Sequence, residues 1–432
     1  MEYDAASFQQ KGVFNTSRNW IFDATRADVE GAGVWQSGAG LLADGSGAVY
    51  LTTGNGKKVL EGHYFGDLVL KVRDGLPRDH SASFTPSELG LKEVTYALDG
   101  AAPPNVYHYK VNANGDPRHL QVSCNPEPAG TKVLERANDI SYLLDFQDLD
   151  LSSGGPMLIP GTSILVAGGK TGVMYLLDSS TMQRIQEFAF STDLDAPCRR
   201  YDFQNGPHLH GAPTYWSISD SLAYIYHWGE KDFLRGYPFV TTTGKVDTEH
   251  PICSFRRSIQ NTADPGSASK CQTPSGSILF ERVRASKCQM PGGSISVSGN
   301  QSGGTAVIWA TTPLDRGETF PLPEADNTDC SQTFFGGGLL LAFDATNLEL
   351  LKTIALPDLS HFQPPTVADG KVFVATASDN GRWEVHVYGI VPLREARQPV
   401  VIEQEYLKAL RTAGQPRTLK YSYKYARVMD KM

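Results

Sequence analysis

An internal repeat of short strands constrains the fold of this chain more than any other feature. Each unit begins with a Gly- or Pro-containing segment that leads into a first strand, and two further apolar strands follow after tight turns. The five units begin at Trp35, Ser153, His210, Met290 and Gln363. Because one such unit cannot bury both of its faces alone, neighbouring units must stack on one another.

The strands of these units recur in the same order. The second strands span 48–52, 163–167, 223–227, 306–310 and 371–375, and the third strands span 67–71, 173–177, 233–237, 339–343 and 385–389. A weaker fourth strand follows at 186–190 and at 350–354. The apolar runs are nearly continuous, as expected for strands buried on both faces. The pattern predicts an all-β protein, a β-propeller of four-stranded antiparallel blades. We expect about five complete blades and a partial N-terminal blade, in a ring of about six to eight blades.

The first residues of the chain resemble the end of a third strand. Tyr3-Asp4-Ala-Ala matches the turns at Asp178 and Asp344, each of which follows a third strand. The repeat therefore predicts that the chain begins in the middle of a blade. Three explanations stay open: the chain is a fragment of a longer protein, another chain supplies the missing strands, or the ring closes in an unusual way.

The repeat also divides the chain into regions. Residues 1–390 are assigned to the propeller, with insertions at about 75–147 and about 244–289, and residues 391–432 form a C-terminal tail with a candidate short helix at 404–412. Long loops on a rigid scaffold are common binding elements. We therefore expect protein partners that contact the insertions and the tail, and one of them could be a chain that completes the propeller.

Composition limits which kinds of partner and which cellular compartment we expect. Lys and Arg number 39 and Asp and Glu 47, and this net charge of -8 argues against nucleic acid as a partner. No apolar run is long enough to predict a membrane span, and the N-terminal segment lacks the apolar core of a signal peptide. Five of the six cysteines lie in polar stretches from Cys198 to Cys330, and none forms a Cys-x-x-Cys pair. This pattern favours disulfides and an extracellular, periplasmic or lumenal location, with free cytosolic thiols as the alternative.

Several segments resemble a known superfamily in the order in which they occur. They are Gly33-Val-Trp-Gln-Ser-Gly, Ser153-Gly-Gly-Pro, Val166-Ala-Gly-Gly-Lys-Thr-Gly, His210-Gly-Ala-Pro-Thr-Tyr-Trp and Pro364-Pro-Thr-Val. Together they resemble the quinoprotein alcohol-dehydrogenase-like propellers with pyrroloquinoline-quinone repeats, and most of all an uncharacterised, secreted-type group. The resemblance covers residues 1–74 and 140–390. It implies a propeller fold and, for the dehydrogenases of the superfamily, a bound quinone with calcium.

The cofactor-docking motif of those dehydrogenases is degenerate here. The family motif is Ala-x-Asp-x-x-Thr-Gly-x-x-x-Trp, and the best copy is Ala342-Phe-Asp344-Ala-Thr-Asn347-Leu348, with Lys352 in place of the Trp. This departure argues against pyrroloquinoline quinone and calcium, and the sequence assigns no catalytic residue. The first hypothesis is therefore a binding or assembly scaffold without an intact quinone site. The alternative is a quinoprotein-like oxidoreductase that holds a quinone and a divalent cation in the central channel.

A His-x-His pair suggests a third function. His208 and His210 would point to the same face of a strand, because side chains alternate with a period of two. Two imidazoles can chelate a transition metal, with Glu230 or Asp232 from the following turn as the third ligand. In the alternative interpretation, one imidazole hydrogen-bonds a neighbouring blade and the other is solvated.

The mouth of the central channel is the predicted pocket for a ligand. The first strands of a propeller line its axis, so hydroxyl, amide, imidazole and thioether groups could converge there and suit a small polar ligand. The candidate residues are Gln36, Ser37, Ser153, His210, Met290 and Gln363. Alternatively, the Gly and Pro residues of these segments simply permit tight packing around the axis.

Overall fold

The chain folds into consecutive antiparallel sheets that surround a common centre. The computed structural model describes residues 2–12, 16, 31–55, 66–72, 83–84, 108–110, 121–123, 149–190, 208–230, 232–257, 271–272, 280–282, 293–300, 304–313, 336–359, 362–377 and 383–389. Within these ranges the regular structure is β-strand, with two short 3-10 turns, η1 (Gln36–Gly38) and η3 (Leu151–Ser153). Most of the first predicted insertion, the C-terminal tail and Met290 lie outside the described residues.

Five sheets follow one another along the chain as blades. The first consists of β3 (Leu42–Ala43), β4 (Val49–Thr52), β5 (Val69–Val72) and β6 (Ser83–Phe84). The second consists of β9 (Met157–Leu158), β10 (Ile164–Gly168), β11 (Val173–Asp178) and β12 (Arg184–Ala189). The third consists of β13 (Thr214–Ser217), β14 (Ala223–Trp228), β15 (Leu234–Val240), β16 (Lys245–Val246) and β17 (Ile252–Cys253).

The fourth blade consists of β20 (Ser294–Gly299), β21 (Ala306–Pro313), β22 (Gly336–Asp344) and β23 (Leu350–Leu359). The fifth consists of β24 (Thr366–Ala368), β25 (Lys371–Ala377) and β26 (Trp383–Gly389). Three two-stranded hairpins accompany the blades: β1 (Glu2–Tyr3) with β2 (Gln10–Gly12), β7 (His108–Lys110) with β8 (Gln121–Ser123), and β18 (Phe255–Arg257) with β19 (Phe280–Arg282).

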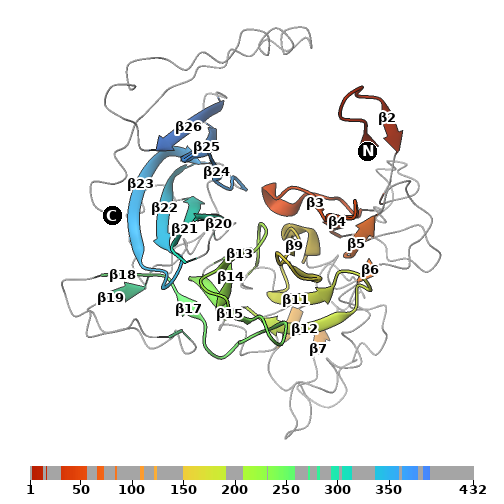
Figure 1. Cartoon of the computed structure of the whole chain (residues 1–432), viewed down its shortest axis with the longest axis horizontal. Coiled ribbons are helices and arrows are strands. Elements are labelled where there is room, and N and C mark those ends of the chain that lie inside the picture. The colour runs from red at the N-terminus through yellow and green to blue at the C-terminus, as the bar shows by residue number, and fades with distance from the viewer. Residues whose placement is uncertain are drawn as a thin grey trace, which may run out of the picture.

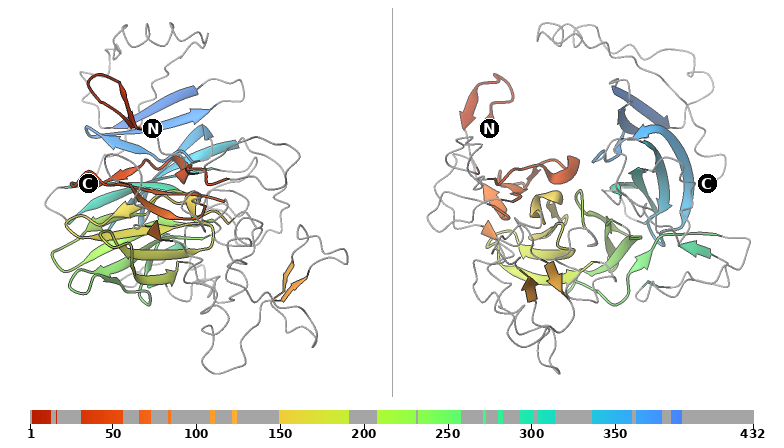
Figure 2. Two further views of the ribbon diagram at one scale, coloured as in Figure 1. Left: turned by 90° about the vertical axis from the view of Figure 1, so that its right-hand side faces the viewer. Right: turned by 180° about the vertical axis from the view of Figure 1, so that it is seen from behind.

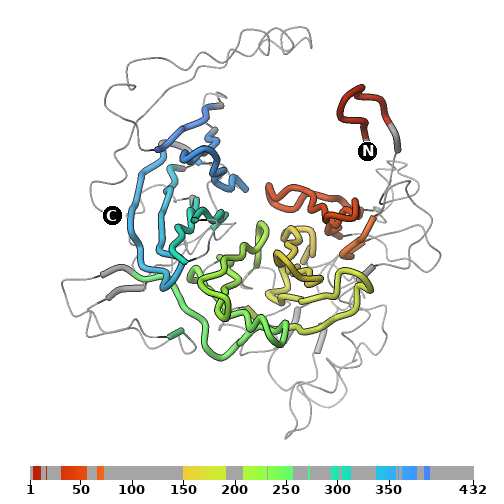
Figure 3. Tube along the Cα trace, viewed as in Figure 1, coloured from red at the N-terminus to blue at the C-terminus, as the bar shows by residue number. Residues whose placement is uncertain are grey.

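The arrangement is that of propeller blades, as the sequence predicts. Figure 1 shows the first strands of the five sheets nearest the centre and the later strands toward the outside. The view from behind shows the same order of sheets around the centre (Figure 2). In the trace of Figure 3, the β1–β2 hairpin and the fifth blade lie at the two ends of an arc of blades. The number of blades in a closed ring stays a prediction.

Apolar side chains from facing blades form the core. One cluster lies between each pair of consecutive sheets, so every inner blade buries both of its faces. Between the third and fourth blades, Trp228 meets Phe343 in an edge-to-face contact with ring centroids 5.8 Å apart. This two-sided burial explains why the strands have nearly continuous apolar runs rather than a polar–apolar alternation.

The Asp turn recurs at the three positions that the sequence predicts. In each turn the Asp side chain accepts a backbone N–H two residues ahead, and the Asp backbone carbonyl accepts the N–H four residues ahead. The residue at this fourth position has a positive φ of 56°, 59° or 61°. Asp4 therefore closes the same turn that joins the third and fourth strands at Asp178 and Asp344.

Two expected boundaries differ in the structure. The predicted insertion at 244–289 begins inside the third blade, because β16 and β17 both pair with β15. Likewise, β6 pairs with β5 and completes the first blade within the predicted insertion at 75–147. The strands β6, β16 and β17 are only two residues long, and such short segments give too weak an alternation to be recognised from sequence. No helix in the described part of the chain has the length and apolar character needed to cross a membrane.

Glycine is required where backbones approach closely near the centre. A Cβ on Gly154 would lie 1.9 Å from the carbonyl oxygen of Gly168, so a larger residue cannot occupy the start of the second blade. A Cβ on Gly38 would lie 2.3 Å from the carbonyl oxygen of Phe362, which places the start of the first blade against that of the fifth. The inner segments of distant blades therefore meet at the axis.

Candidate metal centre

Two turns of the third blade bring His208, His210 and Glu230 together. The two histidines precede β13, and Glu230 lies in the turn between β14 and β15. The Glu230 N–H donates to the carbonyl of His208 over 2.9 Å, which fixes one segment against the other. Leu209 is buried in the apolar cluster between the second and third blades, so the segment that carries both imidazoles is anchored in the core.

The three side chains form a compact buried group. Their exposed fractions are 1%, 2% and 5% for His208, His210 and Glu230. The Nδ1 atom of His208 lies 3.1 Å from Oε2 of Glu230, and Nε2 of His210 lies 2.9 Å from Oε1. One ligand atom from each residue lies within 4.8 Å of the others. The structure thus places Glu230 beside the imidazoles, whereas Asp232 forms an ion pair with Arg235 at 2.7 Å.

The ionisation of the group suits metal ligation. Burial raises the pKa of Glu230, but the two imidazoles within 2.9 and 3.1 Å outweigh it and lower the pKa to about 2. Burial lowers the pKa of His210 below its ordinary value, despite the opposing effect of the Glu230 carboxylate. At neutral pH the group therefore offers an ionised carboxylate and a neutral His210 imidazole, which are the forms that bind metals.

Residues from the first and fifth blades surround His210. The Ser37 hydroxyl lies 3.4 Å from Nδ1 of His210, on the opposite side of the ring from Glu230. The rings of Trp35 and Phe362 lie 5.9 and 5.3 Å from the His210 ring and 5.4 Å from each other. A ligating imidazole is commonly oriented by a hydrogen bond at its other nitrogen, and Ser37 occupies that position.

The second blade carries a different pair at the corresponding turn. The Lys170 N–H donates to the carbonyl of Asp150 over 3.1 Å, as the Glu230 N–H does to His208. The Lys170 ammonium then forms a buried 2.8 Å ion pair with Asp150 and lies 5.3 Å from the centre of the Trp35 ring. In this blade a cation and an anion neutralise each other. In the third blade one carboxylate instead meets two imidazoles.

The other predicted channel residues that the structure describes make hydrogen bonds within the protein, and their role at a channel mouth stays a prediction. The Gln36 side chain accepts from the backbone N–H of Thr52 and donates to the Gly40 carbonyl, so it binds within its own blade. The Ser153 hydroxyl donates to the Leu209 carbonyl over 2.7 Å, and the Gln363 carbonyl accepts from the Thr311 hydroxyl over 2.6 Å. Among the described members of the predicted set, the structure brings the side chains of Ser37 and His210 into contact.

Sequence reasoning did not single out Asp150, Lys170, Trp35 or Phe362 as neighbours of this site. A signal for Lys170 exists, because alignment of the second strands places it in the same turn position as Glu230. Phe362 has no comparable signal, since it approaches His210 only through the arrangement of the blades around the centre.

No protein-family model and no curated protein matches the sequence. Similar solved structures include quinohemoprotein alcohol dehydrogenase from Comamonas testosteroni, at 14% identity and a TM-score of 0.34, covering 87% of this chain and 47% of that chain. Another is BamB from Moraxella catarrhalis, at 13% identity and a TM-score of 0.24, covering 82% and 84%. A europium-containing methanol dehydrogenase matches at 11% identity and a TM-score of 0.26, covering 56% and 42%. Similarities at this level assign no function.

The His208–His210–Glu230 group does not fit the calcium ion of a quinone centre. Calcium prefers six to eight oxygen ligands, whereas His208 and His210 supply nitrogen. In the best copy of the docking motif, the Asp344 carboxylate accepts hydrogen bonds from the backbone N–H and the hydroxyl of Thr346 and so closes a turn between strands. The Asp344 carboxylate therefore serves its own turn rather than a quinone.

Proposed function

We propose that this protein is a metal-binding propeller that holds a divalent transition ion, with zinc as the best match, through His208, His210 and Glu230. The observation that carries the proposal is the convergence of three buried ligand-type side chains within 4.8 Å. Zinc prefers imidazole nitrogen and carboxylate oxygen in tetrahedral geometry. Bonds of about 2.0–2.1 Å imply ligand atoms about 3.3 Å apart. The contacts of 2.9 and 3.1 Å are close to that separation, and ligand atoms that lie up to 4.8 Å apart must move closer when an ion binds.

The electrostatics of neighbouring blades support the same function. A buried carboxylate is unfavourable unless it is paired with a cation or coordinates a metal. In the second blade Asp150 has the Lys170 ammonium, but in the third blade Glu230 faces two imidazoles. A bound cation would give Glu230 the charge partner that Lys170 gives Asp150.

Three protein ligands leave one tetrahedral position for a water molecule. Such sites differ from structural zinc sites, in which four protein ligands close the coordination sphere. Trp35 is 36% exposed and packs against the His210 ring, so one neighbour of the centre reaches the surface. We therefore propose a centre that water can reach past this side chain.

The proposal also includes a binding or assembly role and a location in an oxidising compartment. A binding or assembly role through the long insertions stays a prediction, because those segments lie mostly outside the described residues. The Cys253–Cys271 disulfide supports a location in an oxidising compartment.

Titration with cobalt(II), followed by displacement with zinc, tests the proposal, because cobalt in a tetrahedral site absorbs visible light. The wild-type chain should bind one equivalent. His210→Ala and Glu230→Gln should weaken binding by more than about 100-fold, because each removes a ligand.

The matched control is His250→Ala, which removes an exposed imidazole that pairs with Asp247. This variant should bind cobalt as the wild type does. Failure of the wild-type chain to bind either ion, or equal affinity in all three variants, would contradict the proposal.

A further inference from the structure

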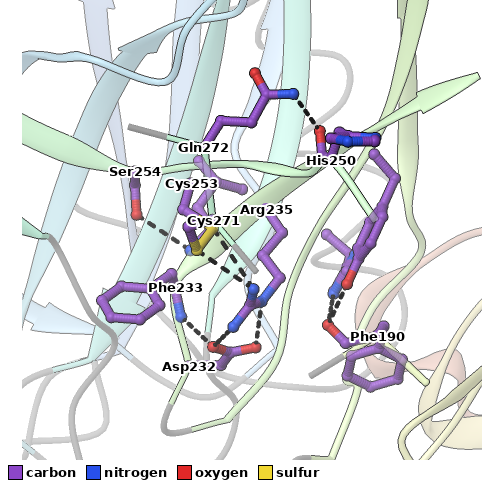
Figure 4. Close-up of a disulfide and its surroundings, with 12 residues drawn as sticks. Phe190, Asp232, Phe233, Arg235, His250, Cys253, Ser254, Cys271 and Gln272 are labelled. Carbon is purple, nitrogen blue, oxygen red and sulfur yellow. Dashed lines mark hydrogen bonds and ion pairs between the residues drawn. A yellow bond between two sulfur atoms is a disulfide. The ribbon is translucent and has the colours of Figure 1, made fainter. Parts of the chain in front are cut away.

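The Cys253–Cys271 disulfide lies against a buried arginine. Nη1 of Arg235 lies 3.5 Å from the sulfur of Cys253 and 3.4 Å from that of Cys271. Figure 4 shows the guanidinium beside the disulfide. Arg235 is completely buried on β15 and pairs directly with Cys253 on β17. Cys253 is 1% exposed, whereas Cys271 is half-buried. The two sulfurs therefore share one guanidinium but differ in their access to solvent.

The same guanidinium holds the turn that carries Glu230. Its Nε and Nη2 atoms donate to the two carboxylate oxygens of Asp232 over 2.9 and 2.7 Å. Asp232 also accepts the backbone N–H of Phe233, and its carbonyl accepts from the indole of Trp228. Asp232 is two residues from Glu230, so Arg235 connects the disulfide to the turn of the metal centre.

We propose that Cys253–Cys271 is a redox-sensitive clamp, in which Arg235 stabilises a Cys253 thiolate and reduction weakens metal binding at the His208–His210–Glu230 centre. This inference rests on the proposed function. Its first element, the ease of reduction, can be tested without any metal.

The reduction step follows from the exposure of the two sulfurs. A thiolate of a dithiol reductant attacks the more accessible sulfur of Cys271, the S–S bond breaks, and Cys253 leaves with the electron pair as a thiolate. The second thiol of the reductant then displaces Cys271 and forms the reductant's own disulfide, so two electrons pass to the protein. Of the two protons released by the reductant, one protonates Cys271 and the other enters solvent while Cys253 stays a thiolate. A better-stabilised leaving thiolate departs faster.

Reduction changes the charges around the turn. In the oxidised protein Arg235 and Asp232 form a bidentate ion pair beside an uncharged disulfide. A Cys253 thiolate adds a second anion that competes with Asp232 for the same guanidinium. The turn then loses part of the contact that fixes Glu230 relative to the imidazoles.

Local hydrogen bonds make the change reversible. The Gln272 backbone N–H donates to the Pro251 carbonyl over 2.8 Å, and its side chain donates to the His250 carbonyl over 2.9 Å. These bonds hold Cys271 next to Cys253 after the S–S bond breaks, so the two thiols can form the disulfide again.

Two measurements on the full chain test the inference. In the first, the protein is equilibrated in buffers with different ratios of reduced to oxidised dithiothreitol, and the number of free thiols per chain is measured at each ratio. We expect the double variant Asp232→Leu with Arg235→Met, which replaces the ion pair by apolar side chains, to be about tenfold harder to reduce than the wild type. Equal reduction of the two proteins would overturn the role of Arg235.

The second measurement is cobalt affinity in the oxidised and reduced states. The reduced wild type should bind cobalt about tenfold more weakly. The double variant Cys253→Ser with Cys271→Ser should show no response to the reductant, which separates this effect from thiol ligation. Cobalt binding that is intact and insensitive to reduction would overturn the clamp but leave the proposed function standing. Loss of binding in both states would reject the proposed function, and the thiol measurement would still decide on the role of Arg235.

Discussion

A buried histidine outside the metal centre should make the stability of the propeller depend on pH. His227 lies on β14, stacks on Tyr237 with ring centroids 5.6 Å apart, and places Nε2 3.3 Å from the carbonyl oxygen of Phe190. Burial is the largest influence on this imidazole, and it lowers the pKa from 6.5 to about 4. The folded protein therefore keeps His227 neutral at a pH where the unfolded chain is already protonated.

The size of the effect follows from proton linkage. As the pH falls below about 6.5, the unfolded chain binds a proton that the folded chain does not, so the free energy of unfolding decreases with falling pH. Each pH unit between the two pKa values is worth about 1.4 kcal/mol. Lowering the pH to about 5 should therefore remove about 2 kcal/mol through His227 alone.

His227→Phe isolates this contribution. The variant keeps an aromatic ring against Tyr237, and the Phe190 carbonyl still accepts the Tyr237 hydroxyl at 3.0 Å. Urea unfolding at about pH 7.5 and about pH 5 should show that the wild type loses about 2 kcal/mol more than the variant. His250→Phe, which removes an exposed imidazole, should lose as much as the wild type. Equal losses in wild type and His227→Phe would refute the reasoning.

Three further substitutions test the packing of the blades. Gly154→Ala should sharply lower the melting temperature, because its Cβ would lie 1.9 Å from a backbone oxygen, whereas Gly45→Ala, with nothing within 4 Å, should behave as the wild type. Phe343→Ala should destabilise the chain to urea by about 3–5 kcal/mol by emptying the cluster between the third and fourth blades. Lys170→Met should lower the free energy of unfolding by about 3–5 kcal/mol, because it leaves the Asp150 carboxylate buried without its cation. Adding Asp150→Asn to Lys170→Met should recover much of that loss. A Lys170→Met variant as stable as the wild type would contradict this account.

The blades could be predicted from sequence because their signals are local. The Gly- and Pro-containing segments, the apolar strands and the Asp turns each occupy a few consecutive residues, and the structure confirms the sheets that they predict. The short outer strands were assigned to insertions because their position depends on pairing with β5 and β15 rather than on their own residues.

The candidate site is only partly readable from sequence. The His-x-His spacing identifies two side chains, but Glu230 and Asp232 follow the same strand and are equivalent by spacing. In the structure Asp232 forms an ion pair with Arg235, and Glu230 is the carboxylate that lies beside the imidazoles. The contact between Phe362 and His210 depends on how distant blades meet at the centre. The pairing of Cys253 with Cys271 likewise could not be chosen from six cysteines.

X-ray absorption spectroscopy of the zinc-loaded chain tests the central claim most directly, because it reports the ligand types around the ion. The account predicts one zinc per chain with nitrogen and oxygen ligands at about 2.0–2.2 Å, including two imidazoles. A sulfur ligand in the spectrum, or zinc surrounded by oxygen ligands without imidazole scattering, would contradict a centre built from His208, His210 and Glu230.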